Sequence, residues 1–124
     1  METVNLKQKF GLFSEYWQPK VVGELNNFAV KIVKVQGEFV WHHHDEEDEL
    51  FLVVQGRLLI QVMEEAESQR DIWVEEGEFV IIPHGVEHRP IAEAETHVLL
   101  LEPNTVLNTG NVQNERTVLN PERL

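Results

Sequence analysis

The sequence has no cysteine, and this absence excludes three kinds of chemistry. Disulfide bridges, zinc sites built on thiolates and cysteine nucleophiles all need a sulfur atom that the chain does not contain. Basic residues are also few, because 22 acidic side chains face 10 lysines and arginines and leave a formal net charge of −12 at pH 7. Nucleic acids and anionic membrane surfaces attract Lys and Arg, so neither is an expected partner.

Long hydrophobic runs are lacking as well. No window approaches the roughly 18 consecutive apolar residues of a membrane-spanning helix, and the N-terminal METVNLKQKFGLF has no apolar signal core. These absences predict a soluble protein of the cytoplasm. Serine occurs only at positions 14 and 68, so no Ser/His/Asp nucleophile arrangement is evident.

What the 124 residues do contain is a series of short β-like runs separated by Gly, Pro and Asn, enough for one domain with a real core. The expected strands are 28–35, 38–44, 49–55, 57–63, 71–76, 78–83 and 96–102. Only Leu6–Trp17 could form a short helix, because no long segment has helical periodicity. About eight strands at this spacing indicate an all-β antiparallel sandwich or barrel.

Several expected strands are apolar on both faces. In the run 49–55, Leu50, Leu52 and Val54 alternate with Phe51 and Val53. A strand with water on one side would alternate more cleanly between apolar and polar residues. We therefore expect the outer face to be covered by another sheet, by the N-terminal residues or by a second subunit, and we predict a homodimer.

Half of the six histidines stand in one run, WHHH, which five acidic residues follow. Side chains two apart in a strand share a face, so His42 and His44 point one way and His43 the other. An antiparallel return would lay Glu49 beside this pair. Imidazole nitrogen and carboxylate oxygen suit Mn, Fe, Ni, Cu or Zn. From these residues alone, the run could be either part of a metal site or a polar loop without a function.

The segment GEFVIIPHGVEH supplies a further imidazole. Pro83 ends the strand and Gly85 permits positive φ, which together could turn His88 back towards the first pair. His84, in the same loop, is the nearest remaining candidate for catalytic proton transfer, although a surface position is the simpler interpretation. His97 begins an apolar strand and is expected to be structural.

The two stretches resemble the two motifs of the cupin superfamily. The matching residues are Gly37, His42, His44, Glu49 and Gly56 in the first motif, and Gly77, Pro83, Gly85 and His88 in the second. The resemblance covers residues 37–92 and has two departures. Gly37 stands one residue closer to the first histidine than is usual, and Ala92 occupies a position where Asn is frequent. The WHHH form is similar to small single-domain cupins of the mannose-6-phosphate isomerase-like type.

This resemblance implies a jelly-roll barrel, the double-stranded β-helix of cupins, over residues 28–102. A short N-terminal arm (1–27) would precede it, and an irregular C-terminal tail (103–124) would pack on the barrel or on a partner subunit. It further implies one divalent transition metal, with Fe, Mn, Zn and Ni as candidates, whose four ligands are His42, His44, Glu49 and His88. Such a site leaves positions open for a ligand, as catalytic metals do.

Strand parity predicts the lining of a ligand cavity. The residues expected to face inward beside the metal are Val40, Phe51, Val53, Val80 and Ile82. An apolar cavity with a polar metal end suits a small, partly apolar, oxygenated organic ligand. Arg57 and Arg89 are conceivable anchors for an anion, but both follow turn residues and are more simply placed on the surface. A sugar phosphate would require a basic cluster, which counts against phosphomannose isomerase activity.

Three functions are compatible with this interpretation. The first is a metal-dependent enzyme, either a dioxygenase or an isomerase or lyase acting on a small metabolite. The second is a non-catalytic cupin that binds or senses a small molecule through its metal. A structural protein with a vestigial site ranks last, because all four ligating residues are present. The sequence does not decide between the first two.

Overall fold

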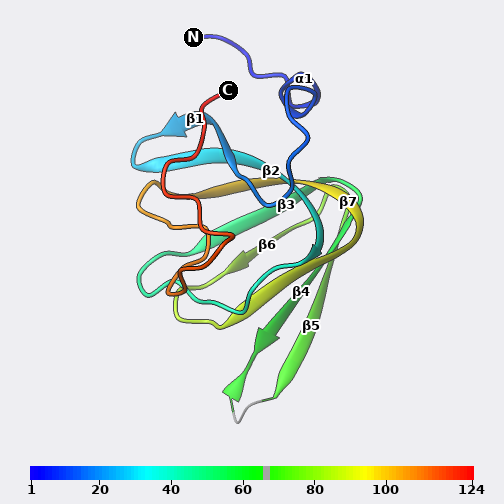
Figure 1. Ribbon diagram of the computed structural model, residues 1–124, viewed down its shortest axis with the longest axis vertical. Coiled ribbons are helices and arrows are strands. Elements are labelled where there is room, and N and C mark those ends of the chain that lie inside the picture. Colours follow the sequence, from blue (N-terminus) through cyan, green and yellow to red (C-terminus); the bar gives the residue numbers. More distant parts are fainter. Residues whose placement is uncertain (66–67) are drawn as a thin grey trace.

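The computed structural model describes residues 1–65 and 68–124, which form one short helix and seven strands (Figure 1). In chain order these are α1 (Leu6–Phe10), β1 (Lys20–Leu25), β2 (Phe28–Glu38), β3 (Glu49–Gln55), β4 (Arg57–Met63), β5 (Gln69–Glu75), β6 (Phe79–Ile82) and β7 (His88–Pro103). All pairings between these strands are antiparallel, so the predicted all-β antiparallel class is confirmed.

Strand β7 joins the two halves of the fold. It pairs with β2 along most of its length, and on its other edge its first residues pair with β4 and its second half with β3. The resulting order is β1-β2-β7-β3-β6, with the β4–β5 hairpin attached through the start of β7. This is the predicted jelly roll in an open form, because β6 pairs with β3 and β5 with β4, and the barrel is not closed between β5 and β6.

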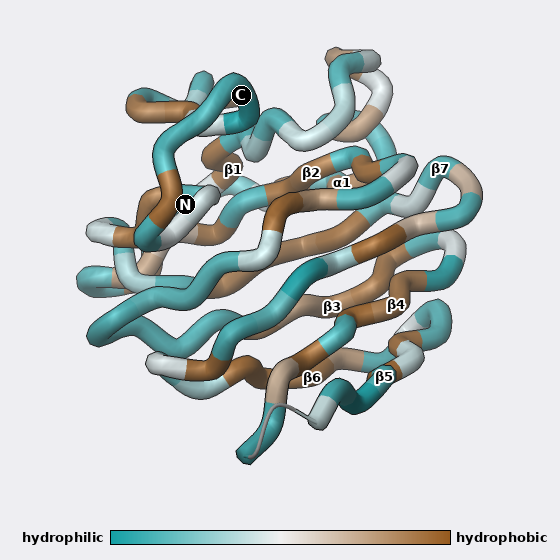
Figure 2. The backbone as a smooth tube through the Cα atoms, turned by 60° about the horizontal axis from the view of Figure 1, so that its bottom comes forward, coloured by the Kyte–Doolittle hydropathy of each residue, from teal (hydrophilic) through white to brown (hydrophobic). Residues whose placement is uncertain are grey.

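The strands follow from the alternation of apolar residues. In β4, the side chains of Leu58, Ile60 and Val62 are buried, whereas the residues between them are only half-buried. Val and Ile favour the pleated conformation, and a period of two places them on one face. Figure 2 shows hydrophobic stretches within the strands and hydrophilic ones in several of the connections. The core fills the space enclosed by the inward faces, where Trp17 stacks on Phe39 at 4.9 Å.

The outer face of β3 is only partly covered. Leu50, Leu52 and Val54 are half-buried there, although the inward Phe51 and Val53 are buried. The helix α1 lies against β2, and Phe10 at its end stacks on the ring of His97 at 4.5 Å. His97 therefore makes a packing contact on the outside of the barrel. In the part of the chain that the structure describes, no helix is long and apolar enough to cross a membrane.

Three segments differ from the expected strands. β1 was not predicted, because it is short and its register against β2 slips beside Gly23. The strand predicted over 38–44 is wrong: β2 bulges between Val35 and Gly37, and the chain leaves the ladder after Glu38. β7 begins at His88 instead of residue 96, since its pairing with β4 accommodates Pro90.

Candidate metal centre

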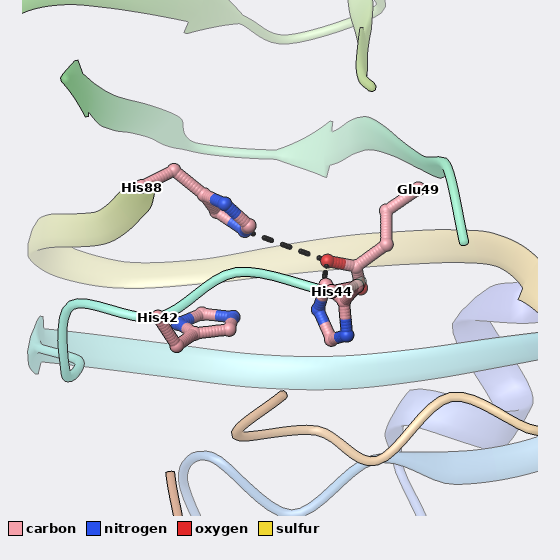
Figure 3. A group of neighbouring side chains, drawn as sticks. All are labelled: His42, His44, Glu49 and His88. Atoms are coloured by element: carbon pink, nitrogen blue, oxygen red, sulfur yellow. Dashed lines mark ion pairs between the residues drawn. The ribbon is translucent and has the colours of Figure 1, made fainter. Parts of the chain in front are cut away.

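Four ligating side chains converge inside the barrel (Figure 3). His42 and His44 come from the irregular segment after β2, Glu49 is the first residue of β3, and His88 is the first residue of β7. One ligand atom from each residue lies within 4.8 Å of the others, and each residue is between 1% and 5% exposed. The structure thus brings together the set that the motif resemblance implied.

An isolated antiparallel bridge sets the first imidazole beside the last. The amide nitrogen of His42 donates to the carbonyl of His88 at 3.0 Å, and the amide of His88 returns the bond at 2.8 Å. Their rings lie 4.3 Å apart. His42 and His44 are buried and the intervening His43 is not. The side chains therefore alternate between the interior and the surface, as predicted, although the segment is not a regular strand.

The backbone selects the tautomer of two of the rings. Nδ1 of His42 lies 2.9 Å from the carbonyl oxygen of Val40, and Nδ1 of His88 lies 2.9 Å from that of Val86. A carbonyl oxygen only accepts, so each Nδ1 carries the hydrogen and each neutral ring keeps a free lone pair on Nε2. Metal-binding histidines are commonly oriented by this kind of contact.

Three buried atoms at the centre lack hydrogen-bond partners among the described residues: Nε2 of His44, Nε2 of His88 and Oε1 of Glu49. The carboxylate oxygen lies 2.7 Å from the first nitrogen and 3.5 Å from the second, without hydrogen-bond geometry. A buried polar atom left unpaired destabilises a fold by roughly 1–3 kcal/mol. A divalent cation between these atoms would satisfy all of them, so the residues fit a metal ion.

The protonation states also suit a metal. Burial, aided by the nearby His88, lowers the pKa of His42 to about 4. Burial alone would raise the pKa of Glu49, but its contacts with Glu102, His44 and His88 outweigh burial and hold that pKa well below its usual range. At neutral pH, His42 is therefore a neutral ligand and Glu49 an ionised one, as metal binding requires.

The lowered pKa of His42 predicts how the metal-free protein responds to acid. The unfolded chain, with a histidine pKa near 6.5, binds more protons than the folded chain between about pH 6.5 and 4. Stability should therefore fall across this window as pH drops, with about 3 kcal/mol traceable to His42. Urea unfolding in the presence of a chelator, at both pH values, measures the fall. His42→Gln should reduce it, and an equal fall in the variant would contradict the assignment.

Two other histidines lie away from the centre. The ring of His43 contacts Glu87 at 2.8 Å, a contact that raises its pKa, and faces Asp45 at 2.9 Å on its other side. The side chain of His84, the candidate for proton transfer, is 61% exposed and lies 3.1 Å from Asp48. Neither ring is among the four groups that converge.

The two arginines considered as anion anchors are both engaged by other side chains of the chain. Arg57 stacks over the ring of Trp73 at 3.8 Å and pairs with Glu75 at 2.8 Å. Arg89 donates to the side chain of Gln61 at 2.7 Å. Neither arginine lines the interior cavity.

A cavity of about 50 Å³ adjoins the centre. Its polar end includes His42, Glu49, Glu102 and Asn108, and its apolar walls include Phe51. Further aromatic and aliphatic lining comes from Trp17, Phe39, Val33, Val98 and Leu100. Sequence parity identified one of these walls, Phe51, but missed Glu102 and Asn108.

The other predicted cavity residues do not line this cavity. Val53 is fully buried in the core, and Val40 packs against that core from the segment after β2. Val80 and Ile82 line a separate cleft of about 700 Å³ between β6 and the β4–β5 hairpin. Their inward direction was predicted, but the open barrel separates them from the space beside Phe51.

The C-terminal tail folds back over the mouth of the barrel (Figure 1). The amide of His43 donates to Oδ1 of Asn111 at 2.9 Å, and the amide of Asn111 donates to the carbonyl of His43 at 3.0 Å. Asn108 is fixed by the carbonyl of Arg116 and the amide of Val118, and it reaches the cavity. These contacts hold part of the tail against the segment that carries His42 and His44.

Comparisons with known proteins agree with this geometry. Residues 29–103 match the family model for the cupin domain. A cupin-2 domain containing protein from Shewanella frigidimarina, of known crystal structure, is 42% identical, with a TM-score of 0.76 over 82% of this chain and 94% of that one. YdbB, an uncharacterized protein of Bacillus subtilis, is 31% identical over 97 residues, which are 78% of this chain and 76% of YdbB.

An enzyme also shows similarity in sequence. The 3-hydroxyanthranilate 3,4-dioxygenase of Xenopus tropicalis is 31% identical over 102 residues, which are 80% of this chain. The matched region is only 36% of that dioxygenase, so most of the enzyme has no counterpart here.

Proposed function

This chain belongs to the cupin domain family, and from that premise we propose that it binds a small oxygenated organic ligand at a divalent metal held by His42, His44, Glu49 and His88. The observation that carries the proposal is the set of three buried, unpartnered atoms directed at one point. A ligand cavity lies beside that point. No purely structural role accounts for both features.

The chain's own residues define what the ligand must be. Glu49 offsets one of the two positive charges, so an anionic oxygen donor would complete the neutralisation. The apolar walls around Phe51 exclude water and favour a hydrocarbon portion. When bound, the metal would act as a Lewis acid, and iron would add redox chemistry with dioxygen.

Among enzymatic roles we place a dioxygenase first. The similarity to a 3-hydroxyanthranilate 3,4-dioxygenase supports this order, although the chain spans only about a third of that enzyme. The alternative is non-catalytic binding or sensing. The cavity beside the centre, about 50 Å³, is small beside the hundreds of Å³ that typical organic ligands occupy, and this applies to either role. An aromatic substrate would therefore need the cavity to widen.

Dioxygen consumption separates the two roles. The protein would be loaded with Fe(II) without oxygen and then mixed with oxygenated buffer and one of 3-hydroxyanthranilate, a catechol or a 1,2-dicarbonyl compound. A dioxygenase should consume dioxygen in proportion to substrate, and Glu49→Ala treated in the same way should not. Saturable binding in calorimetry without consumption would establish the binding role. If none of the compounds reacts or binds to metal-loaded protein, the proposed ligand class is wrong.

The homodimer remains a proposal. It is supported by the half-buried outer residues of β3, among them Leu50 and Leu52, which a second copy could cover. A solution mass equal to one chain at every concentration would exclude it.

A further inference from the structure

A second pocket lies outside the cavity that adjoins the proposed metal centre. This outer pocket, of about 300 Å³, lies between residues 16–18 of the N-terminal arm and residues 115–118 of the C-terminal tail. Among the described residues, Trp17 alone lines both the outer pocket and the inner cavity. Its ring stacks on Phe39 at 4.9 Å, and the ring of Phe39 lies edge-on to His42 at 5.4 Å. Trp17 is therefore the shared wall of the two spaces.

The backbone of Trp17 adopts an unfavourable conformation. Its φ is +62°, in the left-handed region that bulky residues rarely adopt. The other non-glycine residue with positive φ in the described part of the chain is Asn26, in the tight turn between β1 and β2, where asparagine is common. Two hydrogen bonds hold Trp17: its amide donates to the carbonyl of Lys34 at 2.8 Å, and its indole N–H donates to the carbonyl of Gln36 at 2.9 Å. Strain of this kind concentrates at ligand clamps and switch regions, so this position calls for a functional explanation.

The outer pocket carries a positive charge in a strongly acidic chain. Arg116 lines it, and its guanidinium lies 5.6 Å from the centre of the Trp17 ring. The other four arginines each pair with a glutamate, whereas Arg116 has no ion pair within the described residues, not even with Glu115 in the same pocket. A guanidinium in this state can bind a carboxylate through two parallel hydrogen bonds.

The size of the inner cavity also points to the outer pocket. At about 50 Å³ the inner cavity is too small for an organic ligand, whose sites span roughly 300–1,000 Å³, whereas the outer pocket reaches the lower end of this range. The two spaces are tied together on the tail side as well. Asn108 lines the inner cavity, and its side chain is bonded to the carbonyl of Arg116 and the amide of Val118 at the outer pocket.

We propose that the outer pocket is the entry site for an organic ligand bearing a carboxylate, which Arg116 receives and which reaches the metal centre when the Trp17 ring moves aside. This proposal rests on the metal-dependent ligand binding proposed above, and it adds the charge of the ligand and its route. Movement of the ring would join the two spaces. Departure from the left-handed conformation would also release backbone strain, which offsets part of the cost of breaking the two hydrogen bonds of Trp17.

The test measures how fast two matched probes reach Co²⁺ bound to the protein, in the absence of oxygen. Co²⁺ is chosen because its visible absorption changes when a ligand joins its coordination, so no turnover is needed. One probe is 3,4-dihydroxybenzoate, which carries a carboxylate, and the other is 4-methylcatechol, which does not. Stopped-flow mixing gives an association rate constant for each probe with each variant.

Arg116→Gln should slow 3,4-dihydroxybenzoate about 3- to 10-fold at low ionic strength, and added salt should reduce the difference. The same variant should leave 4-methylcatechol at the wild-type rate. Arg123→Gln is the matched control, because Arg123 belongs to the same tail but pairs with Glu24 and lies outside both pockets. Equal slowing in the two variants would show an effect of overall charge and would overturn the role of Arg116.

Trp17→Gly should speed both probes by about 10-fold or more, because the route would no longer depend on a minor open population. Glycine accepts the positive φ of this position without strain. Val33→Ala is the matched control: it also enlarges the inner cavity, but Val33 does not line the outer pocket. Its rates should stay near wild type, and equal acceleration in both variants would contradict the route.

The remaining outcomes are also decisive. If Trp17→Gly does not fold, Trp17→Phe replaces it, and rates no higher than those of Val33→Ala contradict the inference. If wild type binds no Co²⁺, or binds Co²⁺ but neither probe, the proposed function fails together with the inference. Binding of both probes by wild type, at rates that none of the variants alters, removes the inference alone.

Discussion

Replacing Glu49 by alanine is expected to weaken divalent metal binding by more than about 100-fold, beyond what the loss of an indirect contact produces. Glu49 is the only carboxylate among the four converging groups, and the other three are imidazoles. Its removal would take away the one carboxylate ligand of a buried cation, which is strongly unfavourable. Calorimetric titration of chelator-treated protein with Zn²⁺ and Mn²⁺ measures the change.

The matched control for this prediction is Glu46→Ala. Glu46 belongs to the same acidic run and its removal changes the net charge equally, but it is exposed and lies outside the cluster. We expect its affinity to match wild type. Comparable weakening in both variants would mean that metal is attracted by the general negative charge of the chain and not by the buried site.

Replacing Gly110 by alanine should disturb the centre from the C-terminal tail. The backbone of Gly110 has φ of +56°, and a Cβ there would overlap the carbonyl of His43 and approach Cδ2 of His42 to 3.1 Å. The tail would have to move away, breaking the paired bonds between His43 and Asn111. We expect a loss of about 2–4 kcal/mol in unfolding free energy, together with weaker metal binding.

Gly77→Ala is the control that separates the cost of a left-handed backbone from the cost of steric overlap. Gly77 has φ of +84°, but a Cβ there would meet nothing within 4 Å. This variant should lose only about 1–2 kcal/mol, the left-handed penalty, and should bind metal like wild type. Urea unfolding and metal titration of the two variants test the prediction. Equal losses of stability with unchanged metal affinity in both would show that the tail does not support the centre.

The sequence was informative where chemistry and local spacing coincide. His42 and His44 could be placed on one side because the chain stays extended there, even though the regular strand predicted over 38–44 is wrong. The motif resemblance added His88, whose bridge to His42 completes the cluster. Proton transfer by His84 was the weakest expectation, and that residue lies at the surface.

The features that the sequence did not reveal depend on distant partners. Lys31 shares the inward face of β2 with buried Val33, so parity could have flagged it, but Glu102, which accepts a hydrogen bond from its Nζ, lies 71 residues away. The tail has no periodicity to recognise, because bonds between side chains and backbone, such as those of Asn108, hold it. The alternation of residues along the strand also predicted that Val80 points inward. It could not predict that the barrel is open and that Val80 lies away from the metal centre.

Elemental analysis by plasma mass spectrometry, on tag-free protein purified without added metal, tests the central claim most directly. His44→Ala and Glu49→Ala would be prepared and measured in parallel. The predicted result is a near-stoichiometric transition metal in the wild type, among Fe, Mn, Zn and Ni, that is lost from both variants. Wild-type protein that carries no metal, and that binds none of these four when they are added, would contradict the account.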